Sequence, residues 1–258
     1  MKIAHGSDIH LEIWATPEVL PEFPEDCDVL IVAGDLTSHG DGPYQLHRRY
    51  GSDRPIFYVP GNHEYYNSVY QDQLAKIQMG CDRYGIKFLG PDEPHEIDGV
   101  KIIGATLWTD YNLNGDAVAG MSFAGMGMSD HYTIGFREDN GNKWFLPRHA
   151  LELHQEHLNW LLTACAQDYN PRTVVVTHHL PTRKCIHPRW ERSNLNPAFA
   201  SEVLHRFQDF MPALWIYGHS HDAMDVTVGG TRLLSNQLGY KGENYADASG
   251  WSFQVVEI

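Results

Sequence analysis

Residues 29–35 read Val29-Leu30-Ile31-Val32-Ala33-Gly34-Asp35. Such a continuous apolar run, rich in β-branched residues, is typical of a strand that is buried on both faces of a sheet. Asp35 follows the run directly, where a carboxylate has no packing role, and Gly34 lets backbone or ligand come close. Taken alone, Asp35 is equally compatible with a helix N-cap or a turn. The stretch predicts an α/β fold with polar chemistry at the carboxyl end of a strand.

Comparable extended runs and helical patterns alternate along the rest of the chain. We predict buried strands over residues 3–7, 28–33, 56–60, 100–108, 173–177 and 214–217. Shorter antiparallel strands are predicted over residues 224–228, 231–235 and 252–257, the first two joined by a tight Gly229-Gly230 turn. Helices are predicted over residues 67–84, 147–169 and 196–208. Strand, polar block, helix and strand in this order are typical of a layered α/β fold.

Residues 110–146 interrupt this pattern. They contain six glycines and three methionines and show no clear periodicity. A long irregular stretch inside a compact domain is usually a functional lid or a mobile loop. We therefore predict one domain over residues 1–258, with an irregular, lid-like insertion at about 110–146. The alternative is a surface loop without a mechanistic role.

Four further polar blocks follow extended runs in the same way as Gly34-Asp35. They are Asp8-Ile9-His10, Gly61-Asn62-His63-Glu64, His178-His179 and Gly218-His219-Ser220-His221. Each block alone also fits a turn or a buried structural histidine. It is far less probable that all five blocks, each at the end of a predicted strand, have such a structural explanation than that one of them does. Carboxylate, amide carbonyl and imidazole groups gathered at one sheet edge are what a pair of catalytic divalent metals requires.

Composition and charge limit the classes of function. The chain has 33 acidic and 19 basic residues and a net charge of −14, which argues against extended, sequence-independent binding of nucleic acid. No run approaches the ~18 apolar residues of a membrane span, and the N-terminus has no signal-like segment. Four widely spaced cysteines indicate free thiols in a reducing compartment. We expect a cytoplasmic protein with a small substrate and no membrane partner.

The ordered blocks between residues 8 and 221 resemble the signature of the calcineurin-like metallophosphoesterase family. The resemblance implies a four-layer α/β/β/α sandwich with mixed sheets and a dimetal centre at the strand carboxyl ends. It implies a first metal bound by Asp8, His10 and His221, a bridging Asp35, and a second metal bound by Asn62, His178 and His219. His63 matches the position that assists the substrate and leaving group. His178 is preferred to His179 because the family ligand commonly follows the last strand residue directly.

The resemblance also implies a reaction. We expect a metal-dependent phosphoesterase that hydrolyses a small phosphomonoester or phosphodiester, nucleotide-like esters included, by attack of a metal-bridging hydroxide. Mixed oxygen and imidazole ligands accept two ions of Mn, Fe, Zn, Co or Ni, and the sequence leaves their identity and the oligomeric state open. Two alternatives are a nuclease acting on DNA or RNA ends and a non-catalytic scaffold that has kept the fold.

Substrate contacts are predicted from position alone. Residues 183–192 carry a local basic cluster next to a metal-ligand block, which could hold a phosphate or a base against Trp190. A solvated surface loop is the alternative. The candidate substrate-binding residues are His39, His179, Arg183 and Arg189. Three histidines on the helix predicted after Pro147 are assigned to a solvated helix face. They are His149, His154 and His157.

Overall fold

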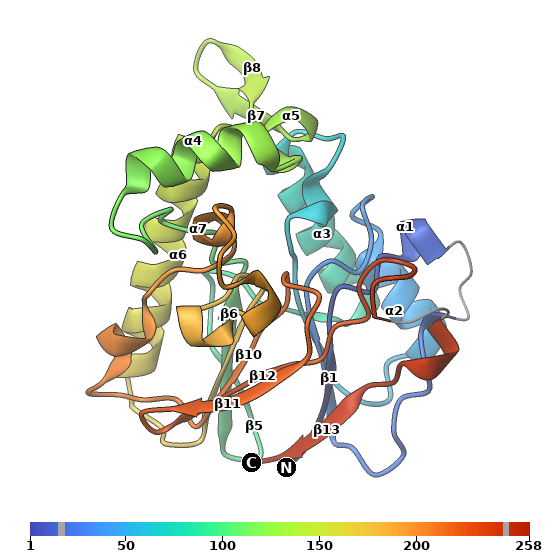
Figure 1. The fold of residues 1–258 in the computed structure, drawn as a ribbon. Helices are drawn as coiled ribbons and strands as arrows, with labels where there is room; N and C mark the ends of the chain where they lie inside the picture. The colour runs from blue at the N-terminus through green and yellow to red at the C-terminus, as the bar shows by residue number, and fades with distance from the viewer. Residues whose placement is uncertain (15–18, 245–247) are drawn as a thin grey trace.

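The computed structural model describes residues 1–14, 19–244 and 248–258, which form two mixed sheets with helices on their outer faces (Figure 1). The first sheet has the order β13-β1-β2-β3-β4. Its strands β1 (Lys2–Gly6), β2 (Val29–Ala33), β3 (Ile56–Val59) and β4 (Lys87–Phe88) are parallel, and β13 (Gln254–Glu257) runs antiparallel beside β1. The polar blocks that follow β1, β2 and β3 therefore start at one edge.

The second sheet has the order β11-β12-β10-β9-β6-β5. Its four central strands are parallel: β6 (Val100–Ala105), β9 (Thr173–Thr177), β10 (Leu214–Ile216) and β12 (Thr231–Ser235). The edge strands β5 (His95–Ile97) and β11 (Met224–Val228) are antiparallel to their neighbours. The predicted turn at Gly229-Gly230 joins β11 to β12. The blocks after β9 and β10 consequently begin at the carboxyl ends of adjacent parallel strands.

Alternate residues of the strands face different hydrophobic cores, which makes the arrangement a four-layer sandwich. Ile3, Ile31 and Val59 pack with Ile102 and Val176 between the two sheets. The outer face of the first sheet packs on α2 (Gly42–Tyr50) and α3 (Tyr70–Tyr84), and that of the second sheet on α6 (Pro147–Ala166). Strands that are covered on both faces explain the near-continuous apolar runs of the sequence. The expected α/β/β/α fold is confirmed.

The predicted helix over residues 196–208 is wrong beyond its first turn. Helix α7 covers only Asn196–Phe199, and a separate 3₁₀ turn covers Leu204–Phe207. Between them Ala200 forms a parallel bridge with Leu180. The Ser201 N–H donates to the Leu180 carbonyl at 3.1 Å, and the Leu180 N–H donates to the Phe199 carbonyl at 3.0 Å. Pairing with the segment that follows β9 therefore replaces the next helical turn.

Residues 110–146, expected to be irregular, instead form α4 (Ala117–Gly127), α5 (Asp130–Thr133) and a hairpin of β7 (Gly135–Glu138) and β8 (Gly141–Trp144). Helix α4 carries small or apolar residues on all sides, so no amphipathic period marks it in the sequence. Asp116 caps it by accepting a 3.0 Å hydrogen bond from the Ala119 N–H. The segment lies at the top of the view in Figure 1, above the carboxyl edge of the sheets.

The prediction of a solvated histidine face on α6 is also wrong. His149, His154 and His157 are all buried, at 2–4% exposure. His149 stacks on Phe136 of β7 and donates from Nε2 to Glu138 Oε1 at 2.9 Å, while His154 Nδ1 contacts the Leu107 carbonyl at 3.1 Å. The 110–146 segment covers part of the helix that would otherwise face solvent. Among the described residues, no helix has both the length and the apolar composition needed to cross a bilayer.

Burial of His157 predicts an acid-labile contribution to stability. Its Nδ1 atom has no hydrogen-bond partner among the described residues, and burial lowers its pKa to about 3. Because the unfolded state binds this proton below its ordinary pKa of about 6.5, stability is lost as the pH falls from about 6.5 toward 3. Between pH 7 and pH 5 the free energy of unfolding should fall in the parent protein. We expect this fall to be about 2 kcal/mol smaller in the His157→Leu variant, which has no imidazole to protonate.

Urea unfolding of the chelator-treated protein at both pH values measures this difference. His205→Leu is the matched control because His205 is exposed. Equal pH dependence of the parent and the His157→Leu variant would contradict a neutral, buried His157.

Candidate functional site

The five polar blocks meet at the edge where β1, β2, β3, β9 and β10 end. Backbone hydrogen bonds join neighbouring loops within each sheet: the Asp8 N–H donates to the Gly34 carbonyl in the first sheet and the Gly218 N–H to the His178 carbonyl in the second, each at 3.0 Å. The His10 N–H donates to the Asp35 carbonyl, also at 3.0 Å. Hydrogen bonds between backbone groups therefore hold neighbouring loops together, independently of their side chains.

Five of the seven candidate ligands have a left-handed backbone. The φ values are 52° for Asp8, 48° for His10, 52° for Asp35, 74° for His219 and 55° for His221. Non-glycine residues rarely adopt this conformation, which costs on the order of 1–3 kcal/mol and persists only where the surroundings enforce it. Gly61 helps to provide the space, because a Cβ atom at that position would collide with the Asp35 carboxylate. The backbone is thus strained where the ligand side chains converge.

A first group of ligand atoms comes from Asp8, His10 and His221, and these atoms all lie within 4.8 Å of one another. His221 Nε2 lies 3.5 Å from Asp8 Oδ1 and 3.2 Å from His10 Nε2. Both Asp8 oxygens accept the His219 N–H at 3.0 Å, which fixes the carboxylate. The loop after β10 therefore positions the aspartate that follows β1.

A second group contains Asp35, His178 and His219, again with ligand atoms within 4.8 Å of one another. His178 Nε2 lies 3.3 Å from Asp35 Oδ2 and 3.0 Å from Asn62 Oδ1. Its other ring nitrogen contacts the Ala33 carbonyl at 2.9 Å, which orients the ring toward Asp35. His10 Nε2 lies 3.9 Å from Asp35 Oδ2, so Asp35 stands between the two groups.

These residues fit two divalent cations on chemical grounds. His219 Nε2 is buried without a hydrogen-bond partner among the described residues, which is costly for an imidazole nitrogen unless it coordinates an ion. The Nε2 atoms of His10 and His221 face each other at 3.2 Å, and a cation between such groups would satisfy both lone pairs. Mixed carboxylate, amide and imidazole donors suit Mn, Fe, Zn, Co or Ni.

His63 lies beside both groups and is held from three sides. Its Nε2 atom is 3.1 Å from the Tyr240 hydroxyl and 3.9 Å from Asp35 Oδ2, and its Nδ1 atom is 3.6 Å from Glu12. The ring stacks on Tyr66 with centroids 4.2 Å apart. Burial lowers the pKa of His63, but the nearby carboxylates of Asp35 and Glu12 outweigh it and raise that pKa to about 9. The two carboxylates therefore favour the protonated imidazole.

Several residues that organise the site escaped the sequence analysis. Glu64 is fully buried and accepts hydrogen bonds from the backbone N–H groups of Asp35, Leu36 and Gly61 at 2.6–3.0 Å. Glu64 is the last residue of the polar block 61–64, and its place beside the candidate site residues Asn62 and His63 could have indicated a role in the site.

The other overlooked residues lie outside the polar blocks. Asp130, from the 110–146 segment, accepts hydrogen bonds from Asn62 Nδ2 and the Tyr66 hydroxyl, both at 2.8 Å. Glu243 contacts His221 Nδ1 at 2.6 Å. Neither Asp130 nor Glu243 follows a predicted strand, and no local pattern distinguishes them from surface acids.

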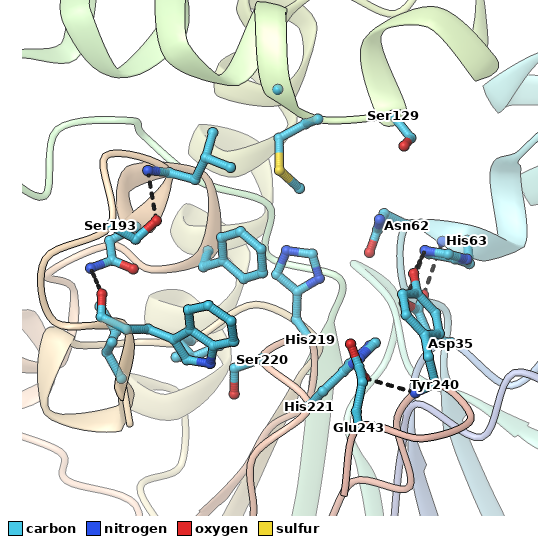
Figure 2. Close-up of a pocket in the computed structure, with 18 of the residues that line it drawn as sticks. Asp35, Asn62, His63, Ser129, Ser193, His219, Ser220, His221, Tyr240 and Glu243 are labelled. Carbon is cyan, nitrogen blue, oxygen red and sulfur yellow. Dashed lines mark hydrogen bonds and ion pairs between the residues drawn. The ribbon is translucent and has the colours of Figure 1, made fainter. Parts of the chain in front are cut away.

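A cavity of about 330 Å³ opens onto the candidate ligands. Figure 2 shows Asp35, Asn62 and His63 on one side of it and Ser193 on the opposite side, with His219 between them. Its lining comes from the loops after β2, β3, β9 and β10 and from the end of α4. The site is thus an open pocket that can admit a small molecule.

The structure separates the four residues predicted to bind substrate. Arg189 lines the cavity, whereas His39, His179 and Arg183 do not. His39 is exposed on another part of the surface, and Arg183 donates to the Leu113 carbonyl and pairs with Glu202 at 3.3 Å. His179 is buried at 2% exposure, with its Nδ1 atom 3.1 Å from the Thr106 carbonyl.

Comparison with known proteins agrees with this geometry. The model of the calcineurin-like phosphoesterase family matches residues 1–223, and the chain belongs to this family. Over 209 residues it is 26% identical to the uncharacterized protein L509 of Acanthamoeba polyphaga mimivirus, covering 73% of this chain and 69% of that protein.

Among solved structures, the phosphopantetheinyl hydrolase PptH of Mycobacterium tuberculosis is similar, with a TM-score of 0.73 and 19% identity. The similarity covers 99% of this chain and 95% of that chain. At this level of identity the comparison shows a shared fold.

The buried carboxylate of Glu64 generates a stability prediction. We expect Glu64→Gln to lower the free energy of unfolding by about 3 kcal/mol, because the amide NH₂ would face backbone N–H donors that then lack an acceptor. Tyr58→Phe is the matched control, since it removes the 2.8 Å hydrogen bond from the Tyr58 hydroxyl to the same carboxylate and should cost about 1 kcal/mol. Urea unfolding distinguishes the two. Equal costs would mean that Glu64 is not needed to hold the loops.

Proposed function

We propose that this protein is a metal-dependent phosphoesterase that hydrolyses a small phosphomonoester or phosphodiester. The observation that carries the proposal is the convergence of two ligand groups on Asp35 at the floor of a cavity. Membership of the calcineurin-like phosphoesterase family supports it. The proposed ligands are Asp8, His10 and His221 for one cation, Asn62, His178 and His219 for the other, and Asp35 for both.

The residues around the ligands have distinct tasks in this proposal. Two bound divalent cations would supply water activation and neutralise charge on the phosphoryl oxygens. Asp35 and Asp8 are kept in place by the N–H groups of His63 and His219, so their carboxylates need not reorganise during turnover. His63, protonated and next to Asp35, is placed to donate a proton to the departing ester oxygen.

We also propose that residues 1–258 work as one catalytic domain in which residues 110–146 cover the cavity. Met128 at the end of α4 lines the cavity, and Asp130 holds the side chain of Asn62. Because the amide N–H₂ of Asn62 is bound to Asp130, its carbonyl oxygen is free to face His178 and a cation. The covering segment therefore contributes to the orientation of a proposed ligand.

The two alternatives are disfavoured by specific features. A nuclease needs cationic contacts along a nucleic acid, but the chain has a net charge of −14 and the cavity arginine, Arg189, is paired with Asp222. A scaffold that has lost catalysis has no need of metal ligands, whereas all seven candidate positions keep ligand-type side chains. A small phosphoester remains the best-supported substrate.

A panel of esters tests the proposal. We expect chelator-treated protein to be inactive, and Mn²⁺ or another of the expected metals to restore cleavage of a bis-aryl phosphodiester or an aryl phosphomonoester. Cyclic nucleotides, a phosphopantetheinyl ester and single-stranded DNA complete the panel. Asp35→Asn should reduce kcat/KM by about 10²-fold or more, because it removes the charge that both cations share.

Asp53→Asn, an isosteric change at an exposed acid, is the control and should leave kcat/KM unchanged. A metal-loaded preparation that cleaves none of these esters would overturn the proposed function and favour a scaffold. Cleavage of DNA alone would favour a nuclease.

The role of His63 is tested separately. We expect His63→Asn to reduce kcat by about 10²–10⁴-fold, because the group that protonates the leaving oxygen is lost. The metal content, measured by elemental analysis, should remain at the parent level. His39→Asn, at an exposed histidine outside the cavity, is the control. Unchanged turnover in His63→Asn with full metal content would exclude this role.

A further inference from the structure

The cavity has two chemically different sides. One side holds the candidate ligands and His63. The other side is apolar and comes mainly from the segment between β9 and β10, together with the end of α4. Its side chains, called here the apolar wall, are Met128, Leu180, Ile186, Trp190, Leu195 and Phe199. Figure 2 shows Ser193, which lines the cavity from the same segment between β9 and β10, across the cavity from Asn62 and His63.

The apolar wall is held in place by hydrogen bonds and ring contacts. Trp190 donates from Nε1 to Asp222 Oδ2 at 2.8 Å, and its carbonyl accepts Asn196 Nδ2 at 2.8 Å. Phe199 stacks on His219 with ring centroids 4.4 Å apart. The wall therefore begins at a proposed metal ligand and extends away from it. A group attached to a phosphoryl centre at the metals would lie along this wall.

The cavity has little free positive charge for a second anionic group. Among its described lining residues, Arg189 is the sole lysine or arginine. Its guanidinium pairs with Asp222 at 2.8 Å and 3.1 Å, and the Asp222 side chain is only 8% exposed. Glu243 adds a carboxylate to the lining. An additional carboxylate or phosphate on the substrate would lose its water without gaining an unpaired cation.

We propose that the apolar wall selects phosphoesters whose organic group is uncharged and apolar, and rejects those whose organic group carries a further anionic group. This inference rests on the proposed phosphoesterase function. It differs from the expectation that the basic cluster of residues 183–192 holds a phosphate, because the other basic side chains of that segment lie outside the cavity. The proposed specificity-determining residues are those of the wall, which include Trp190 and Leu195.

Two esters with the same leaving group test the selection. The probes are hexyl 4-nitrophenyl phosphate and 5-carboxypentyl 4-nitrophenyl phosphate, which have similar length and differ by one negative charge. With the metal-loaded full chain, we expect kcat/KM for the hexyl ester to exceed that for the carboxypentyl ester by about tenfold or more. Release of 4-nitrophenolate reports both reactions in the same way.

A charge placed on the wall should change the selection. Leu195 is half-buried at the cavity, so Leu195→Arg can add a cation there without burying it fully. We expect this variant to lower the hexyl preference by about tenfold, mainly through KM. Met79→Arg is the matched control, because Met79 is 70% exposed on α3 and does not line this cavity. Leu195→Gln, which is polar but uncharged, serves if Leu195→Arg does not fold, and should lower the preference to a smaller extent.

The outcomes separate the two levels of the proposal. A hexyl preference that falls in the Leu195 variants and not in Met79→Arg supports the selection by the wall. Equal kcat/KM for the two esters, or a preference that the folded Leu195 variants retain, overturns the selection and leaves the phosphoesterase function standing. Failure to cleave either ester or any aryl phosphate after metal loading overturns the proposed function itself.

Discussion

The carboxylate of Glu64 is the interaction on which the candidate site depends. It gathers N–H groups from the loops that follow β2 and β3, and so fixes the distance between Asp35 and Asn62. An unpaired buried N–H group is expensive, which means that these loops cannot separate without a large loss of free energy. This constraint allows Asp35 to remain at a positive φ angle. The strain at the ligands is thus supported by a buried acceptor that does not line the cavity.

Continuous apolar runs made the sheets predictable, since only strands covered on both faces can be apolar at every position. The polar blocks were predictable for the complementary reason, because a buried run that ends in histidine or aspartate has no packing explanation. Helix α4 was not predictable. It has apolar or small residues on every side, so the periodic signal that marks an amphipathic helix is absent. The end of α7 depends on pairing between Ala200 and Leu180, a contact that no local pattern encodes.

The same limit applies to single side chains. His154 and His157 lie on a helix with many polar neighbours, yet both are buried, and His154 contacts the Leu107 carbonyl of a distant loop at 3.1 Å. Arg183 and Arg189 belong to one basic stretch, yet Arg183 lies outside the cavity and pairs with Glu202, whereas Arg189 lines the cavity and pairs with Asp222. Sequence shows which residues carry charge. The partners that neutralise these two arginines are Glu202, 19 residues after Arg183, and Asp222, 33 residues after Arg189. No local pattern indicates such distant pairs.

The proposed metal ligands and the proposed substrate-selecting residues lie in different parts of the chain. The proposed ligands follow strands of the two sheets, where backbone pairing leaves little freedom to vary. The apolar wall comes from connections that leave those strands, and connections tolerate substitution more readily than sheets do. Asp222 joins the two parts, because it follows His221 directly and also binds Arg189 and Trp190. A change in the wall can therefore alter the ester that is accepted while the ligand geometry is kept, provided that Asp222 retains its two partners.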